Sequence, residues 1–465
     1  MSIFCGFRTH SIKYVNSRAG FRQVRIVRTV FACLCVLLVL PVVTTAQSIP
    51  DPAQLVDTRN SSEVELGQAV TLALDHSLEL ASIRAHSNAI RAASSYAGAL
   101  PDPTLSLNAM NMPTDTFSLD QEPMTQMQVA LSQSFPFPGK RKLRREVVEY
   151  QASASDQMET ERRSRIIGDV RIAWWQLMSL DKALQIVEQN KDLMRDFVQI
   201  AQTKYRVGSG LQQDVLLAQL ELSRLLGREL RLQGMRRSSR ARLNSLMNRP
   251  ADWPLELPAS PRNTALPELP AERQLLQRAE TDRALIDVQR DLVDSANANL
   301  ELARKDRWPD FKLGVGYGFR QGNDPLRNTD RSDFLSVMLS INVPLYSGSK
   351  QTKAVEQRAY ELSRQTLVMQ DTLRGVEGAV SENLATYLAA REQVLLLDTA
   401  IIPQAQQTVS SMLAGYRVNE VDFLNLVNTQ ITLYNAQINY WESLSTAKQA
   451  LAKLASAIGV ETLYE

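Results

Sequence analysis

The chain has 465 residues, of which 44% are hydrophobic and 22% charged, so its composition is that of a folded protein rather than a disordered one. Its formal net charge of +2 is unevenly distributed, because the first 46 residues contain six basic residues and no acid. The remainder carries 46 basic and 50 acidic side chains. This balance excludes the strongly basic surface of a typical nucleic-acid-binding protein, and we expect no nucleic-acid partner.

The N-terminal segment, residues 1–46, has the layout of a secretory signal peptide. A basic flank precedes an apolar run from Phe31 to Val43, and small residues follow before Gln47. The alternative is an N-terminal membrane anchor, but a membrane-spanning helix needs about 20 apolar residues and this run is shorter. All three cysteines lie in this segment, so the mature chain would contain neither disulfides nor thiolate metal sites.

The rest of the chain contains two related halves. The Tyr-Arg-Val triplet that begins at Tyr205 recurs at Tyr416, and the Pro-Asp pair that begins at Pro101 recurs at Pro309. A period of about 200 residues is too long for a solenoid, so we predict a duplicated domain. The boundaries that we expect are a first repeat at 47–249, a proline-rich linker at 250–270 and a second repeat at 271–465.

The first half is predicted to contain a helix, two strands, a very long helix, a turn and another helix. Residues 141–204 contain almost no glycine or proline, and as one continuous helix they would extend about 96 Å. Helices at 68–98 and 211–248 together match that length, so we expect them to lie end to end beside it.

The second half repeats this layout. Helices at 273–306 and 420–458 are expected to lie end to end beside a long helix at 349–415. Pro403 should kink or break that long helix near Ile402, because proline lacks the backbone N–H that a helix interior needs. The alternative is an ordinary helical bundle with breaks that the sequence does not mark, but the matching lengths in both halves argue against it.

Four short segments alternate large apolar residues with small or polar ones. In residues 311–319 every odd position is large and apolar, whereas the even positions are lysine or glycine. Residues 335–343 and two segments of the first half, around Ser106 and Ala130, follow the same period. Because successive side chains of a strand point to opposite faces, each segment is predicted to be a strand with one apolar face.

Two placements fit such strands: a soluble sheet half buried on a core, and a membrane β-barrel with lipid outside and water inside. Export of the chain, the small polar face and the lack of a partner layer favour the barrel. The length of about 9–10 residues also suits a tilted membrane strand. The side chains expected to face lipid are Leu105, Leu107, Val129, Leu131, Leu313, Val315, Tyr317, Val337, Leu339 and Ile341.

Four strands are too few to enclose a conducting pore. In lipid every sheet edge must nevertheless be paired, because hydrocarbon offers no hydrogen bonds. Three chains would supply twelve strands, which is enough for an open channel. The sequence therefore predicts a homotrimer that is mainly helical, with a small twelve-stranded β-barrel in lipid and a helical tunnel that continues from it.

The mature chain resembles, over essentially its whole length, the TolC family of outer-membrane efflux proteins. Besides the duplicated halves, the resemblance rests on four motifs: Phe135-Pro136-Phe137-Pro138-Gly139-Lys140-Arg141, Tyr205-Arg206-Val207-Gly208, Asp214-Val215-Leu216-Leu217-Ala218-Gln219 and Tyr434-Asn435-Ala436-Gln437. The first motif is similar to the CzcC-like branch of the family, which is tied to heavy-metal efflux.

The resemblance implies a duplicated TolC-like fold and a trimer in the outer membrane of a Gram-negative bacterium, with its tunnel extending into the periplasm. It also implies two protein partners, a periplasmic adaptor and an inner-membrane RND transporter driven by the proton gradient. The trimer would be the passive exit duct of this tripartite pump and would conduct exported compounds, including heavy-metal cations, without a cofactor.

The resemblance further implies that the turns after the two long helices are periplasmic tips. Two glycines in the first turn permit the backbone angles that such a turn needs. The residues expected to contact the adaptor are Tyr205, Arg206, Val207, Gly208, Gly210, Tyr416, Arg417 and Val418.

The family also closes its channel at these tips, where acidic residues ring the aperture and attract cations. The candidates in this chain are Asp214, Glu420, Asp422, Asn425 and Asn428. The two asparagines stand where the best-known member carries aspartates, so Glu420 and Asp422 are the alternative carboxylates. Asp214 and Asp422 also fit a purely structural role at helix N-termini, where capping and the helix dipole favour acids.

No catalytic constellation appears, and we expect neither enzyme activity nor a metal centre. His76 and His86 lie ten residues apart on one predicted helix, whereas a two-histidine helical metal site needs a spacing of four. The arginine-rich run 224–242, with Glu221 and Glu229 beside it, is predicted to be a solvated helical face, with ion pairs between subunits left open.

Two other classes of protein are the alternatives to the exit duct. A periplasmic coiled-coil adaptor predicts one long helical hairpin and a soluble sheet, which the duplicated strand pairs do not fit. A periplasmic enzyme on a helical scaffold lacks any candidate site.

Overall fold

The computed structural model describes residues 63–324, 329–418 and 420–463, so the predicted signal peptide at 1–46 lies outside the described residues. The described chain is mainly helical with one four-stranded sheet, as predicted. The first half contributes α2 (Leu66–Asp75), α3 (Leu78–Ala97), β1 (Thr104–Met110), β2 (Gln126–Phe135), α4 (Lys140–Arg206) and α5 (Gln212–Leu246). The second half contributes α6 (Glu272–Asp282), α7 (Ala284–Lys305), β3 (Phe311–Phe319), β4 (Asn323–Asp324), β5 (Thr329–Asp330), β6 (Phe334–Ile341), α8 (Gln351–Leu396), η1 (Leu397–Ile401), α9 (Ile402–Arg417) and α10 (Phe423–Ile458).

Each half contains the very long helix that its sequence predicts. Helix α4 has 67 residues, which corresponds to about 100 Å at 1.5 Å per residue. From Gln351 to Arg417 the second half is helical throughout, but the segment η1 is a π-helix. Pro403 is the second residue of α9, the helix that follows η1. The wider π-turn accommodates the missing N–H, so the expected interruption is a change of helix type rather than a break.

The shorter helices differ from the prediction, because 68–98 and 273–306 are each two helices. In the first half Ser77 ends the irregular step between α2 and α3, and its side-chain oxygen accepts a hydrogen bond of 3.2 Å from the N–H of Leu80. His76 therefore lies at the end of α2 and His86 in α3, and the prediction of one shared helix was wrong. In the second half the step lies at Arg283, which has an extended backbone between α6 and α7.

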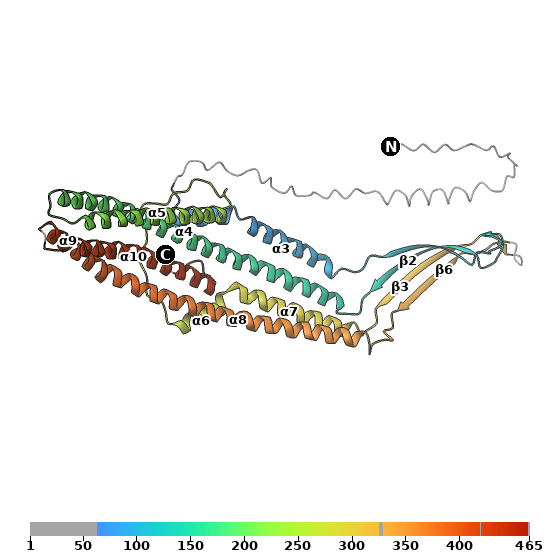
Figure 1. Ribbon diagram of the computed structural model, residues 1–465. Helices are drawn as coiled ribbons and strands as arrows, with labels where there is room; N and C mark the ends of the chain where they lie inside the picture. The colour runs from blue at the N-terminus through green and yellow to red at the C-terminus, as the bar shows by residue number, and fades with distance from the viewer. Residues whose placement is uncertain (1–62, 325–328, 419, 464–465) are drawn as a thin grey trace, which may run out of the picture. The chain divides into compact units, whose positions relative to one another are not determined.

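The helices form one row near the sheet and an equivalent row further from it. Helix α4 packs against α3 and α5 of its own half and against α7 and α10 of the second half, while α8 packs against α7 and α10. Figure 1 shows α3 and α4 beside α7 and α8. The row near the sheet has the order α3-α4-α7-α8. The row further from the sheet has the order α5-α4-α10, and its last position is taken by α8 and then by α9. Among the described elements, α3 and α5 stand at one edge and α8 and α9 at the other.

The sheet has the order β1-β2-β3-β6, and each neighbouring pair is antiparallel. The register aligns the predicted apolar residues in rows. Leu105 pairs with Leu131, Leu131 with Val315, and Val315 with Val337. Because paired residues of adjacent strands point to the same side, all four apolar sets lie on one face.

Residues 250–270, the predicted linker, are largely non-helical and are held by hydrogen bonds to the helices. The Tyr387 hydroxyl donates to the carbonyl of Pro267, and Lys448 Nζ donates to the carbonyl of Ala265 at 2.7 Å. Burial lowers the pKa of Lys448 from 10.5 to about 8. The ammonium of this half-buried side chain is disfavoured because partial desolvation penalises its charge.

We expect Lys448 to make stability rise with pH. Its folded-state pKa lies below its unfolded-state value, so between about pH 8 and 10.5 the unfolded chain binds more protons at this site. The penalty of the partly desolvated charge is fully present below pH 8 and is relieved as pH rises. The measurement is the midpoint of urea unfolding at pH 7.5 and pH 9.5 for the wild type and Lys448→Met. The wild type should gain more than the variant, and equal gains would contradict the expectation.

Candidate functional site

The first candidate site is the apolar face of the sheet. All ten side chains predicted to face lipid lie on this face and are exposed, from Val129 at 36% to Val337 at 77%. Leu335, Phe319 and Val343, which the same alternation assigns to the apolar side, are also exposed. In a water-soluble monomer a continuous apolar face of this kind is rare, so it marks a surface that something apolar covers.

The opposite face of the sheet is polar, and three glycines of β3 shape it. Gly314, Gly316 and Gly318 are buried under side chains from the neighbouring strands. A Cβ atom at Gly316 would lie 2.7 Å from Nε2 of Gln128, so a larger residue would displace that glutamine. The glycines thus make room for a layer of glutamine and serine side chains on this face.

The second candidate site is the pair of helix tips. In the first tip Tyr205 and Arg206 end α4, and Gly208 has a positive φ of 76°. Gly210 sits close to α4, because a Cβ atom there would lie 2.8 Å from the Cβ of Lys204. Gly208 therefore supplies the special backbone angle that was predicted, whereas Gly210 lacks a positive φ and is needed for its close approach to α4.

Replacing Gly208 should destabilise this tip. Alanine at a left-handed backbone position costs on the order of 1 kcal/mol, whereas asparagine tolerates that conformation better. Amide hydrogen exchange of residues 203–212 should therefore become faster in Gly208→Ala, and less so in Gly208→Asn. If these amides exchange as slowly in both variants as in the wild type, the turn does not depend on glycine at this left-handed position.

The two tips of one chain are joined through Lys204 and Tyr416. Lys204 Nζ lies 4.2 Å from the ring centre of Tyr416 and donates a hydrogen bond to its carbonyl oxygen. The ring of Tyr416 also lies 5.1 Å from that of Phe423 at the start of α10. Tyr416 is therefore buried, whereas the other tip residues Tyr205, Arg206, Val207, Arg417 and Val418 are exposed. The sequence pattern did not point to Lys204 or Phe423.

The acids at the tips occupy different environments. Asp214, in the first turn of α5, is buried and accepts a hydrogen bond from the backbone of Leu211. Burial and the nearby charge of Asp422 raise the pKa of Asp214. Burial and the same two carboxylates raise the pKa of Tyr416 to about 12. Asp422 precedes α10, and Glu420, Asp422, Asn425 and Asn428 are all exposed.

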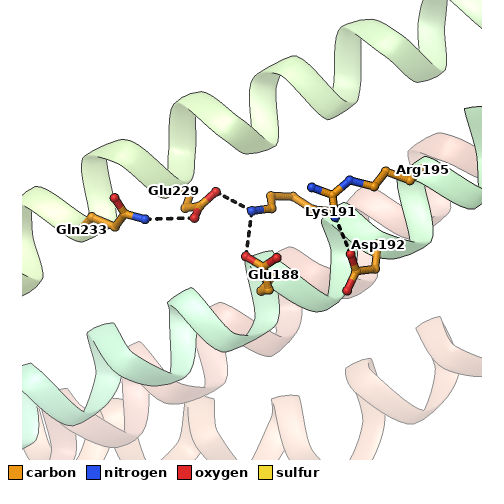
Figure 2. A network of polar contacts seen from close by, with 6 residues as sticks. All are labelled: Glu188, Lys191, Asp192, Arg195, Glu229 and Gln233. Atoms are coloured by element: carbon orange, nitrogen blue, oxygen red, sulfur yellow. Dashed lines mark hydrogen bonds and ion pairs between the residues drawn. The ribbon is translucent and has the colours of Figure 1, made fainter. Parts of the chain in front are cut away.

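A polar network joins α5 to α4 (Figure 2). Lys191 is buried, and its Nζ lies 2.7 Å from Glu188 and 2.6 Å from Glu229 of α5. Hydrogen bonds to both carboxylates raise the pKa of Lys191. Figure 2 also shows Gln233 donating to Glu229 at 2.9 Å.

These contacts correct one prediction about α5. Glu221 and Glu229 do not lie on a solvated face, because Glu221 is 3% exposed and accepts a hydrogen bond from Tyr434, while Glu229 is part of the network with Lys191. Arg236 is likewise paired with Asp181 of α4. The pattern of charges in α5 did not show that their partners come from other helices.

Within the described ranges, no helix combines the length and apolar character needed to cross a membrane. In the same residues no group of three or more histidine, cysteine, aspartate or glutamate side chains is placed to hold a metal ion.

Comparison with known proteins identifies relatives for both halves. The family model described as "Outer membrane efflux protein" matches residues 69–249 and 275–460. The alkaline protease secretion protein AprF of Pseudomonas aeruginosa is 23% identical over 306 residues, which cover 64% of this chain and 61% of AprF. The cobalt-zinc-cadmium resistance protein CzcC of Cupriavidus metallidurans is 22% identical over 42% of this chain and 44% of CzcC. The alignments thus span less than two thirds of either relative.

Solved structures show the same fold. The outer membrane protein VceC of Vibrio cholerae superposes with a TM-score of 0.71 at 17% identity, over 85% of this chain and 96% of VceC. At this identity the likeness concerns the fold alone.

Proposed function

Because the chain belongs to the outer membrane efflux protein family, we propose that it is the outer-membrane exit duct of a tripartite export pump. The observation that carries this proposal is a sheet with an exposed apolar face, in which each of the two outer strands has one edge without a partner strand. In the described part of the chain β1 pairs only with β2, and β6 only with β3. An open, apolar sheet of this kind is incomplete as a single copy.

Lipid requires the open edges to be closed by other copies. Each unpaired backbone group in hydrocarbon costs several kcal/mol, so β6 of one copy pairs with β1 of the next until the sheet closes. Three copies give twelve strands, with the apolar face toward lipid and the glycine-rich face toward the lumen. The helices follow the same circular order, with α3 and α5 of one copy beside α8 and α9 of the next, and so form the periplasmic tunnel.

The tips close the tunnel and bind the adaptor. The exposed residues Tyr205, Arg206, Val207, Arg417 and Val418 contact a periplasmic adaptor, with Gly208 and Gly210 shaping the turn and Tyr416 packed behind it. Glu420, Asp422, Asn425 and Asn428 surround the aperture, and buried Asp214 supports it through Tyr416 and Asp422. The energy comes from an inner-membrane RND transporter, so the duct itself performs no catalysis.

The N-terminal segment and the linker delimit the two repeats. Residues 1–46 act as the export signal and are removed. The mature chain consists of repeats at 47–249 and 271–465, which the linker 250–270 joins. This division is supported by the equivalent series of helices and strands on both sides of the linker.

Two classes of cargo for the duct follow from its relatives. Similarity to a cobalt-zinc-cadmium resistance protein supports heavy-metal cations as the cargo. Similarity to a protease secretion protein supports a second candidate, export of a protein through the same duct. In both cases the selection of cargo would lie upstream of the duct, at the transporter.

Deletion of the gene tests the function and separates the two cargoes. For an efflux duct, the deletion strain should accumulate cobalt, zinc or cadmium and grow at lower metal concentrations than its parent, and plasmid-borne wild type should restore both. For a secretion duct, a protein should disappear from the culture medium while metal tolerance stays normal. If the deletion changes neither metal content nor the secreted proteins, the duct function is wrong.

A further inference from the structure

The outer face of α5 is a stripe without a partner in the described chain. Opposite the residues that pack on α4, small and apolar side chains recur at helical spacing: Leu216, Leu220, Ser223, Gly227, Leu230, Gly234 and Ala241. Leu230 is 69% exposed, and a methyl group added at Gly234 would meet no other part of this chain within 4 Å. Arg237 flanks the stripe, is exposed and has no ion-pair partner among the described residues.

Helix α8 has a matching face at the other edge of the molecule. Its side away from α7 and α10 carries Ala385, Leu388, Ala389 and Leu396, all of them exposed. The acid on this stretch is Glu392, which is exposed and likewise has no ion-pair partner in the part of the chain that the structure describes. One edge thus offers an unpaired cation and the other an unpaired anion, each beside small and apolar side chains.

Arg237 and Glu392 lie at the same distance from the tips, measured along their helices; this distance is their height above the tips. Contact between Lys204 and Tyr416 places both tips of a chain at one level. Heights on neighbouring helices then follow from residue counts, as the pairs Lys191–Glu229 and Asp181–Arg236 show for α4 and α5. Arg237 lies about 25 residues above the start of α5, and Glu392 lies about 25 residues above the end of α9, or roughly 38 Å at 1.5 Å per residue.

Resting on the proposed ring of copies, we propose that α5 of each copy docks along α8 of the next, with Arg237 paired to Glu392 of that neighbour. Rotation about the ring axis changes no heights, so the two side chains meet when the ring closes. Gly234 and the alanines of α8 allow the helices to approach closely. Charges beside an apolar seam select the partner and its register, as they do in coiled coils.

A cysteine pair tests the docking geometry, since residues 47–465 contain no cysteine. In Ala241→Cys/Ala389→Cys, mild oxidation should link copies into covalent dimers and trimers. The control is Ser223→Cys/Ala389→Cys, in which the first cysteine lies on the same stripe but about 27 Å lower than Ala241. This pair should remain unlinked. Assembled oligomer in the outer membrane without a link in the first pair would overturn the docking while leaving the exit duct intact. Failure of all variants and of wild type to form an oligomer would instead remove the proposed function.

A charge swap tests the ion pair itself. Arg237→Glu and Glu392→Arg should each lower the temperature at which the oligomer dissociates in dodecyl sulfate, and the double variant should recover most of that loss. Arg242→Glu, an exposed arginine on the same helix away from the stripe, is the matched control and should change little. If the double variant is no more stable than the single variants, the two side chains do not meet.

Discussion

Arginine in place of Val337 should keep the chain out of the outer membrane. Val337 lies in the middle of β6, opposite Val315, and its side chain is 77% exposed on the apolar face. An arginine on the lipid face of a barrel strand costs about 2–4 kcal/mol near the bilayer centre, and a trimer would carry three of them. The measurement is the amount of heat-sensitive oligomer in the outer-membrane fraction, which should fall to a small part of the wild-type amount.

The neighbouring residue provides the control for this substitution. Ser336 pairs with Gly316 and points to the polar face. Arginine there would line the water-filled lumen, so Ser336→Arg should still insert, as should Val337→Leu. If Val337→Arg inserts as well as Ser336→Arg does, the two faces do not differ in their surroundings, and the apolar face is not in lipid.

Loss of Glu161 should produce the largest stability defect in the helical part. Glu161 of α4 is 3% exposed, and its carboxylate lies 3.1 Å from the guanidinium of Arg283, at the step between α6 and α7. Removing one partner leaves the other charge buried, which typically costs about 3–5 kcal/mol. Glu161→Ala should therefore strongly lower the midpoint of urea unfolding followed by circular dichroism.

Glu159 is the matched control, two residues earlier in the same helix. It pairs with Arg84 at 2.6 Å, but Arg84 is 57% exposed. Exposed pairs contribute less than about 1 kcal/mol, so Glu159→Ala should leave the midpoint nearly unchanged. Equal shifts for the two variants would show that the contact between Glu161 and Arg283 has no special part in joining the halves.

Much of the fold could be predicted because its signals are local. The alternation in β3 and β6 gave the strands and the face on which Val315 and Val337 lie. The absence of helix breakers gave α4, and Gly208 gave the turn after it. Each of these features depends on the backbone preference or the period of neighbouring residues.

The features that the sequence did not reveal depend on distant contacts. The step at Arg283 fits beside Gly459, where a Cβ atom would lie 2.6 Å from the Cα of Arg283, and beside Glu161 of the other half. Neither neighbour is visible from residues 273–306 alone. The sequence around Glu221 likewise predicts a solvated acid, but in the fold Tyr434 of α10 covers it. The burial of Tyr416 between the tips has the same cause, since Lys204 and Phe423 come from different helices.

The number of copies in the membrane-inserted assembly tests the central claim most directly. Native mass spectrometry of the wild-type protein, extracted from outer membranes in mild detergent, should give the mass of three chains, which is the number that closes twelve strands. A single copy, or a water-soluble protein in the periplasmic extract, would contradict the account, because one sheet with two open edges cannot line a channel in lipid.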